Sequence, residues 1–320
     1  MKIKTINKIL DNKFESFAKS IKCEKTRRLV EGNTIITGGA IASMLLQEDV
    51  NDYDMYFRDL ETTLAVAGYY VKQFKKSNPN VNMIVQNSAD KEDFSSIVGV
   101  WDEGDEDWVK EKPRVTLYIR SVGVVKEKET LEGVFDETLG NLGVEGDSED
   151  MLGFAKQRTT NSKNVYKPIF FTSNAITLSN DIQLVLRFYG PPEEIHENYD
   201  YIHCTNYWTS WNKELVLNLE ALKSLMSRDL KYSGSLYPIC SIIRMRKFIK
   251  RGWTITAGEI FKMCYQISKL DLDDFKVMNE QLIGVDVAYF NELICSLKEA
   301  KDTGKNIDYG YLVTLIDEIF

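Results

Sequence analysis

The 320-residue sequence predicts an α+β fold in two parts, with a mixed β-sheet and flanking helices in residues 1–218 and an all-α domain in residues 219–320. Two observations support this division. Short apolar runs of strand character alternate with helical periodicity up to residue 218, which is typical of a sheet covered by helices. From Leu219 onward the apolar residues recur at helical spacing. Two polar stretches, near 87–113 and 127–164, are interpreted as acidic loops inserted in the first part.

Composition and charge narrow the class of protein. The net charge of −8 argues against a protein that grips nucleic acid over its whole surface and leaves room only for a local basic patch. No run of about 18 apolar residues could span a membrane, and the polar N-terminus lacks the apolar core of a signal peptide. The five cysteines form no C-x-x-C pair, so neither a zinc site nor a disulfide framework is indicated. We therefore expect a cytoplasmic protein without membrane association.

The first elements follow from residue type and spacing. Apolar residues at helical spacing predict an amphipathic helix over Ile3–Cys23. Thr34–Thr37 contains only β-branched residues and predicts a strand, after which Gly38-Gly39 allow a tight turn. Strong helix formers predict a short helix over Ala40–Gln47, and Asn51–Phe57 is predicted to be the next strand.

Two aspartates on that second strand indicate metal chemistry. Asp52 and Asp54 are two residues apart, so both side chains leave the same face of the strand with Cα atoms about 6.5 Å apart. Ionised carboxylates so placed repel each other and favour a divalent cation, for which oxygen ligands suit Mg²⁺ or Mn²⁺. The N–H groups at the start of the preceding helix attract phosphate. Glycine turn, helix N-terminus and aspartate pair are therefore predicted to meet on one metal-bound triphosphate.

This stretch resembles the head motif of the polymerase-beta-like nucleotidyltransferases, nearest the branch of CCA-adding enzymes and poly(A) polymerases. Gly38-Gly39-Ala40 and Asp52-Tyr53-Asp54 match that motif in type, order and spacing. The resemblance implies that Gly38, Gly39 and Ala40 bind triphosphate oxygens through backbone N–H groups, and that Asp52 and Asp54 hold the metal ions. The structural alternative is a strand edge with a solvent-facing Asp-x-Asp pair.

In that superfamily a third carboxylate on a neighbouring strand completes the metal site. Asp200 is the best-placed acid, at the head of a predicted strand that follows a short helix starting at Pro191, and Asp181 is the reserve candidate. The alternative for Asp200 is a turn residue between helix and strand. His203 and Cys204 follow it and are interpreted as packing residues rather than ligands or nucleophiles.

The segments between these motifs supply the rest of the predicted sheet. A helix is predicted over Leu60–Lys75, strands over Asn82–Gln86 and Arg114–Ser121, and several strands over Lys167–Asn218. The second inserted loop contains three cations that could reach a phosphate, although a solvated loop is the preferred interpretation: Lys156, Arg158 and Lys163.

The helical part carries two further resemblances. A helix over Leu219–Leu230 ends in Arg228-Asp229-Leu230, which looks like the Arg-Asp-Phe element that contacts the nucleotide sugar and base in CCA-adding enzymes. The threonine and asparagine that usually follow are replaced by Lys231 and Tyr232, so the match is partial.

Residues 237–253 resemble the neck helix of the same family. Arg244, Lys247 and Arg251 fall on one helix face, where they are predicted to bind a triphosphate or an RNA end, with a solvated face as the alternative. The residues predicted to be buried are Ile242, Ile243, Phe248 and Ile249. The acidic pair that reads the base edge in CCA-adding enzymes is absent ahead of Pro238, so base choice is not transferable. Four further helical stretches are predicted between Ala257 and Phe320.

The resemblance implies a metal-dependent nucleotidyltransferase. Such an enzyme would move a nucleoside monophosphate from a nucleoside triphosphate, ATP or CTP, to a hydroxyl acceptor and release pyrophosphate. An RNA end such as that of tRNA is the expected acceptor. Two alternatives stay open: a non-catalytic nucleotide- or protein-binding protein that keeps the fold, and a nucleotidyltransferase that modifies a protein.

Overall fold

A computed structural model describes most of the predicted sheet region, residues 1–218, and the first part of the predicted helical domain. The described residues are 2–77, 82–87, 115–120, 166–171 and 174–272, with single residues 277, 281, 310, 311 and 314. Predictions outside them concern the two acidic loops apart from Asn87, the cations Lys156, Arg158 and Lys163, and nearly all of the helices expected after residue 272.

The helices agree with the sequence periodicity in most places. Their bounds are α1 Ile3–Ser20, α2 Glu24–Asn33, α3 Gly39–Leu46, α4 Leu60–Ser77, α7 Pro192–His196, the 3₁₀ helix η2 Ile202–Cys204, α8 Leu219–Ser227, α9 Pro238–Lys250 and α10 Ala257–Ile267. Helix α2 was not predicted. Within the described residues, no helix combines the length and apolar character needed to cross a bilayer.

The strands form one large sheet and two small ones. Their bounds are β1 Thr34–Thr37, β2 Tyr53–Phe57, β3 Asn82–Asn87, β4 Val115–Arg120, β5 Pro168–Phe171, β6 Ala175–Leu178, β7 Ile182–Tyr189, β8 Tyr207–Thr209, β9 Glu214–Val216, β10 Asp229–Leu230 and β11 Thr254–Ile255. The large sheet has the order β5-β6-β7-β2-β1-β8-β9. Its β2–β7 pair is parallel and its other pairs are antiparallel, so the predicted mixed sheet is confirmed.

Two details of the predicted architecture are wrong. Strands β3 and β4 pair with each other along their whole length, from Asn82 opposite Arg120 to Asn87 opposite Val115, and form a ribbon separate from the large sheet. The helical part is not purely α, because β10 and β11 pair in parallel. Both corrections reflect backbone pairing between segments distant in sequence, which local periodicity does not report.

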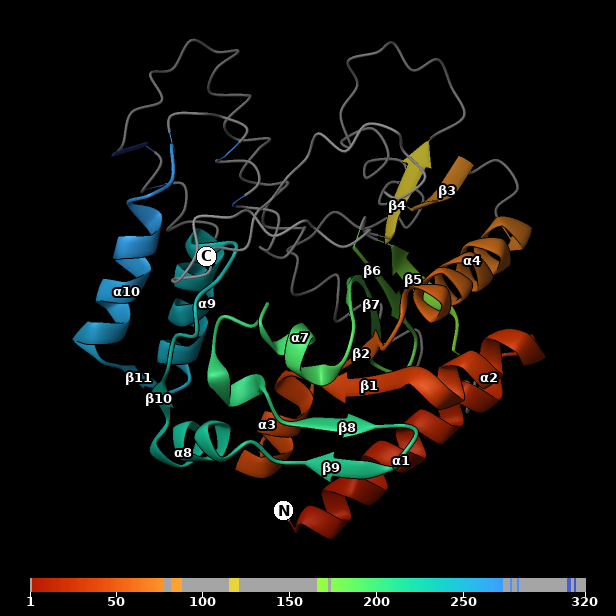
Figure 1. Cartoon of the computed structure of the whole chain (residues 1–320), viewed down its shortest axis with the longest axis horizontal. Coiled ribbons are helices and arrows are strands. Elements are labelled where there is room, and N and C mark those ends of the chain that lie inside the picture. The colour runs from red at the N-terminus through yellow and green to blue at the C-terminus, as the bar shows by residue number, and fades with distance from the viewer. Residues whose placement is uncertain are drawn as a thin grey trace.

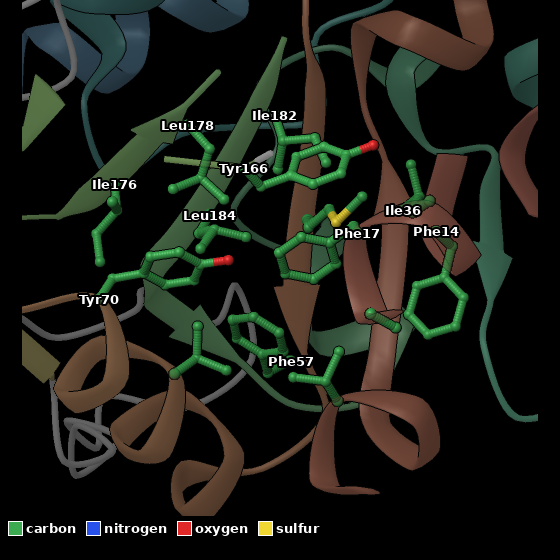
Figure 2. Close-up of a cluster of buried hydrophobic side chains, with 14 of the residues drawn as sticks. Phe14, Phe17, Ile36, Phe57, Tyr70, Tyr166, Ile176, Leu178, Ile182 and Leu184 are labelled. Carbon is green, nitrogen blue, oxygen red and sulfur yellow. The ribbon is translucent and has the colours of Figure 1, made fainter. Parts of the chain in front are cut away.

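One face of the large sheet carries the main core (Figure 2). Phe14 and Phe17 of α1 pack there against Phe57 of β2 and Leu184 of β7, and Tyr70 of α4 joins the same cluster. Because side chains alternate along a strand, Ile35 and Tyr56 point to the opposite face, where they meet Ile195 of α7. Asp54 shares this second face, so the predicted chemistry lies away from the main core.

The helical segments lie to one side of the sheet, with α9 and α10 side by side (Figure 1). They are joined to the sheet region by a second buried cluster that includes Ala42 of α3, Tyr201, Leu225 and Trp253. The predicted burial of Ile242 and Ile249 is wrong, since these side chains are 37% and 47% exposed. Helix α9 instead turns Cys240, Ser241 and Phe248 inward.

Candidate active site

The glycine turn lies directly against one of the two predicted metal ligands. Strand β1 ends at Thr37, which is opposite Asp54 of β2, and Gly38 then turns the chain into α3 with φ of 93°. A Cβ atom on Gly38 would lie 2.9 Å from Oδ2 of Asp54, closer than real Cβ contacts come. Only glycine combines this backbone conformation with this approach. The two halves of the predicted motif therefore meet in space.

The start of α3 offers backbone donors beside this carboxylate. No side chain caps that end of the helix. The N–H of Gly38 donates to the carbonyl of Cys204 over 3.2 Å, so the phosphate contact predicted for this amide is already used within the protein. The predicted contacts from Gly39 and Ala40 rest on the first N–H groups of the helix itself, which have no intrahelical acceptor.

Asp54 sits in an environment that disfavours its charge. It is partly buried, whereas Asp52 is exposed just before the first residue of β2. Burial, and then the negative charge of Asp52, raise the pKa of Asp54 to about 8. A divalent cation would offset both effects, so this pair of carboxylates fits the predicted Mg²⁺ or Mn²⁺.

The prediction that Asp200 lies on a strand next to Asp54 is wrong. Its carbonyl accepts a hydrogen bond from Ser233 N (2.9 Å), and Ile202 N donates to the carbonyl of Lys231 (3.1 Å). The backbone here is thus held by the helical part rather than by the sheet. The cause is Tyr201, whose side chain is 1% exposed within the cluster between α3 and α8.

The carboxylate of Asp200 forms an ion pair with Arg244 of α9. It is nevertheless close enough to the site to matter electrostatically. Burial first, and then the charges of Asp200 and Asp54, raise the pKa of the Cys204 thiol. Cys204 therefore lies within reach of both carboxylates, and the role of Asp200 as a third metal ligand stays a prediction.

The reserve candidate, Asp181, belongs to the opposite face of the sheet. Its charge acts on Tyr53 and on Lys13 of α1, whose Nζ lies 4.5 Å above the Tyr53 ring. Because Tyr53 and Asp54 are adjacent on β2, their side chains point to opposite faces. Among the described residues, no group of three or more His, Cys, Asp or Glu side chains is arranged to hold a metal ion.

Arg228 and Asp229 make contacts between elements of the protein. Arg228 donates to Oε1 of Glu48 (2.7 Å) and to the carbonyl of Arg251 (3.0 Å). Thr254 Oγ1 lies 3.2 Å from Oδ1 of Asp229 and donates to it. These contacts tie α8 to the loop after α3 and to β11. Nucleotide contacts by these two residues remain a prediction.

The predicted basic stripe on α9 divides between two environments. Arg244 is turned inward to Asp200, whereas Lys247 and Arg251 are exposed. Burial, and then the charge of Asp54, raise the pKa of Tyr56, and the nearby charge of Arg244 offsets a small part of this rise. The stripe therefore places one cation near the site and the others at the surface.

Sequence reasoning missed several polar residues on the face that holds Asp54. Nε2 of His196 lies 2.9 Å from Oγ1 of Thr37. Arg187 is 9% exposed on β7, the strand beside Asp54, and donates to the Tyr237 hydroxyl. Tyr199 packs its ring on Tyr56. The only available signal in the sequence was Arg187, a cation within the apolar run of β7. His196 and Tyr199 have no such local signal.

Comparison with known proteins identifies the family. The model of the Gabija anti-defense 2 protein family matches residues 8–228. The chain belongs to the Gabija anti-defense 2 family. The matched region contains the glycine turn, Asp52, Asp54, Tyr199 and Asp200, and it ends before α9.

One curated relative carries the family's name, Gabija anti-defense 2 of Bacillus phage SPbetaL7. It is 22% identical over 122 residues, which are 38% of this chain and 30% of that protein. The chain thus matches less than a third of the relative's length.

Two solved structures are also similar. A tRNA-processing enzyme with CTP is 10% identical, with 80% of this chain and 49% of that chain covered, at a TM-score of 0.35. A tRNA-processing enzyme in an apo form is 12% identical, with 95% and 70% covered, at 0.32. These scores fall below the level that shows a shared fold.

Proposed function

We propose that the chain is a metal-dependent nucleotidyltransferase. One observation carries the proposal: the glycine turn that opens α3 lies against the carboxylate of Asp54, with room for no Cβ between them. Anion-binding amides and a metal-binding acid thereby border one site. A nucleoside triphosphate with its divalent cation has the charges that such a site would bind.

In this proposal each group has a distinct part. Asp52 and Asp54 hold Mg²⁺ or Mn²⁺, which when bound would neutralise phosphate charge and activate the attacking hydroxyl. The amides of Gly39 and Ala40 bind triphosphate oxygens. The hydroxyl oxygen of the acceptor bonds to the α-phosphorus, the bond to the β-phosphate oxygen breaks, pyrophosphate leaves, and the hydroxyl proton passes to solvent. Asp200, which forms an ion pair with Arg244 through Oδ2, would add a third ligand.

An RNA end is the acceptor that the surface of the helical part supports. Lys247, Lys250 and Arg251 of α9 are exposed. On the neighbouring α10, the rings of Phe261 and Tyr265 are 69% and 57% exposed and stack at 6.4 Å. Exposed aromatic rings beside cations bind unpaired bases by stacking and phosphates by charge. The alternative product is a nucleotidylated protein, which the labelling experiment described below also detects.

The family's name refers to opposition to a defence called Gabija. We propose that nucleotidyl transfer by this chain serves that role, with a nucleic acid or protein of the host as the acceptor. Expression of the wild type in cells that carry Gabija should restore phage plating, and the Asp54→Asn variant should not. Equal restoration by both proteins would separate the anti-defense role from the chemistry.

The direct test follows label from each α-labelled nucleoside triphosphate into RNA, DNA or protein of a lysate with Mg²⁺. Wild type should transfer label, and Asp52→Asn and Asp54→Asn should lose it at least about 100-fold. The matched control is Asp181→Asn, on the opposite face of the sheet, which should retain activity. Transfer by the Asp54 variant at the wild-type rate would rule out the proposal.

A non-catalytic binding protein is the second candidate. It is favoured by the ion pair that occupies Asp200 and by the absence, among the described residues, of an assembled three-ligand metal group. This candidate predicts that the wild type transfers no label with any nucleotide or divalent cation, whether or not nucleotide binds.

A further inference from the structure

A buried hydroxyl group lies beside the glycine turn. The oxygen of Tyr199 lies 3.5 Å from the point where a Gly38 Cβ would stand, and Oδ2 of Asp54 lies 2.9 Å from the same point. The open side of Gly38 is therefore bordered by a carboxylate and a phenol. Sequence analysis did not single out this tyrosine.

The Tyr199 hydroxyl is buried but forms no hydrogen bond of ordinary distance and angle with the protein. Burial, and then the neighbouring Tyr56 and Asp54, raise the pKa of this hydroxyl, and Thr37 is near enough to lower it slightly. Thr37 is already occupied, since its Oγ1 lies 2.9 Å from both Nε2 of His196 and the carbonyl of Asn206. Buried hydroxyls without a partner are uncommon, because water is lost and nothing replaces it.

The position of this hydroxyl is fixed by packing. The Tyr199 ring lies 6.1 Å from the ring of Tyr56 and 5.1 Å from that of His196, between centroids. Its backbone N–H donates to the carbonyl of His196 over 3.0 Å at the end of α7. The donor is therefore held in place before any ligand arrives, which lowers the entropy cost of binding.

We propose that Tyr199 binds substrate, with its hydroxyl donating a hydrogen bond to a phosphate oxygen of the nucleoside triphosphate. The inference rests on the proposed function and adds a residue to it. The first amides of α3 attract an anion to the turn, and Tyr199 supplies a further donor beside the same turn. A phosphate oxygen accepts from both and satisfies the buried hydroxyl.

The test compares Tyr199→Phe with Tyr207→Phe as a matched control. Tyr207 also packs on His196, at 5.6 Å between ring centroids, but its hydroxyl lies 3.5 Å from Oε1 of the exposed Glu193. Affinities for MgATP, magnesium tripolyphosphate and AMP are measured by calorimetry on full-length proteins. Thermal unfolding without ligand is measured on the same samples.

We expect Tyr199→Phe to bind MgATP and magnesium tripolyphosphate about tenfold more weakly than wild type. AMP affinity should fall only if the hydroxyl contacts the α-phosphate. The melting temperature of this variant should stay equal or rise, because the change removes an unsatisfied buried hydroxyl. Tyr207→Phe should match wild type for all three ligands. A structural role would instead lower the melting temperature of Tyr199→Phe.

Three results would overturn the inference, and they can be told apart. If Tyr199→Phe binds MgATP and tripolyphosphate as tightly as wild type, the tyrosine does not contact phosphate and the proposed function stands. If Tyr199→Phe has a lower melting temperature but unchanged affinity, the hydroxyl stabilises the fold through Asp54 and does not bind phosphate. If wild type itself binds neither ligand, the proposed function fails together with the inference.

Discussion

Gly38 combines a φ of 93° with direct contact to the Asp54 carboxylate, and Gly39 beside it does neither. Gly38→Ala should lower the free energy of unfolding by roughly 1–3 kcal/mol, since a strained φ and a clash add together. Gly39→Ala should be tolerated, because a Cβ there meets nothing within 4 Å. Urea unfolding of both variants checks this pair, and equal losses would show that the turn is not the constrained position.

The pKa of Asp54 gives a stability prediction with a definite sign. Its folded value, about 8, lies above the unfolded value, so the folded state holds the proton more tightly. This contribution is fully present below pH 4 and is lost as the pH rises through 8. Asp54→Asn should therefore be more stable than wild type at pH 8 and show a smaller fall in melting temperature between pH 5 and 9. If the melting temperatures of the two proteins change with pH in parallel, the raised pKa of Asp54 is contradicted.

Residue type and spacing were sufficient to predict the glycine turn and its close approach to Asp54. They were insufficient for Tyr199 and His196, because nothing local marks a tyrosine or a histidine that will fold back onto a turn some 160 positions away. The Gly38 amide was also misjudged, since its acceptor is a carbonyl of the distant Cys204.

At the scale of elements, the segment after α7 is where local pattern and structure disagree most. Alternating residues predicted one strand from Asp200 to Thr209, but η2 interrupts it and only β8 joins the sheet. Tyr201 and His203 are taken into the cluster shared with α8 and α9, and tertiary packing of these rings overrides strand propensity. The short runs with strong local signals, β1, α3 and β2, were predicted within two residues of their observed ends.

His203 makes that packed segment sensitive to acid. It is 1% exposed beside Phe248 and Trp253, and burial lowers its pKa to about 4. The neutral ring contributes stability above pH 6.5, and this is lost as the pH falls toward 4, because the unfolded chain takes up the proton first. His203→Phe should keep its stability better between pH 6.5 and 4.5. Thermal unfolding across this pH range measures the difference. If the melting temperature of His203→Phe falls with pH as steeply as that of wild type, His203 does not cause the acid sensitivity.

At the scale of the whole molecule, the sheet region and the helical part are tied together beside the candidate site. The Asp200–Arg244 ion pair joins the segment after α7 to α9, and Arg228 joins α8 to Glu48. The sequence predicted two parts with a boundary near residue 218, but the cluster of Ala42, Leu225 and Trp253 shows shared packing across it. Contacts of this kind depend on how elements dock, which no single segment encodes.

The effect of the Asp200–Arg244 ion pair on stability can be separated from the proposed role of Asp200 in metal binding. The Asp200 side chain is 12% exposed and that of Arg244 is 39% exposed. Because solvent screens the pair, Arg244→Gln should cost up to about 1 kcal/mol of stability, and Asp200→Asn/Arg244→Gln should recover part of it. If Asp200 also binds metal, Asp200→Asn should lose transfer activity while Arg244→Gln keeps more of it. Additive stability losses in the double-mutant cycle would show that the pair is not coupled.

The most direct measurement is calorimetric titration of ATP, with and without Mg²⁺, into wild type, Asp54→Asn and Asp181→Asn. We predict that wild type and Asp181→Asn bind ATP only with Mg²⁺, and that Asp54→Asn loses this metal-dependent binding. No binding to wild type, or undiminished binding to Asp54→Asn, would contradict a shared site for metal and triphosphate at the glycine turn.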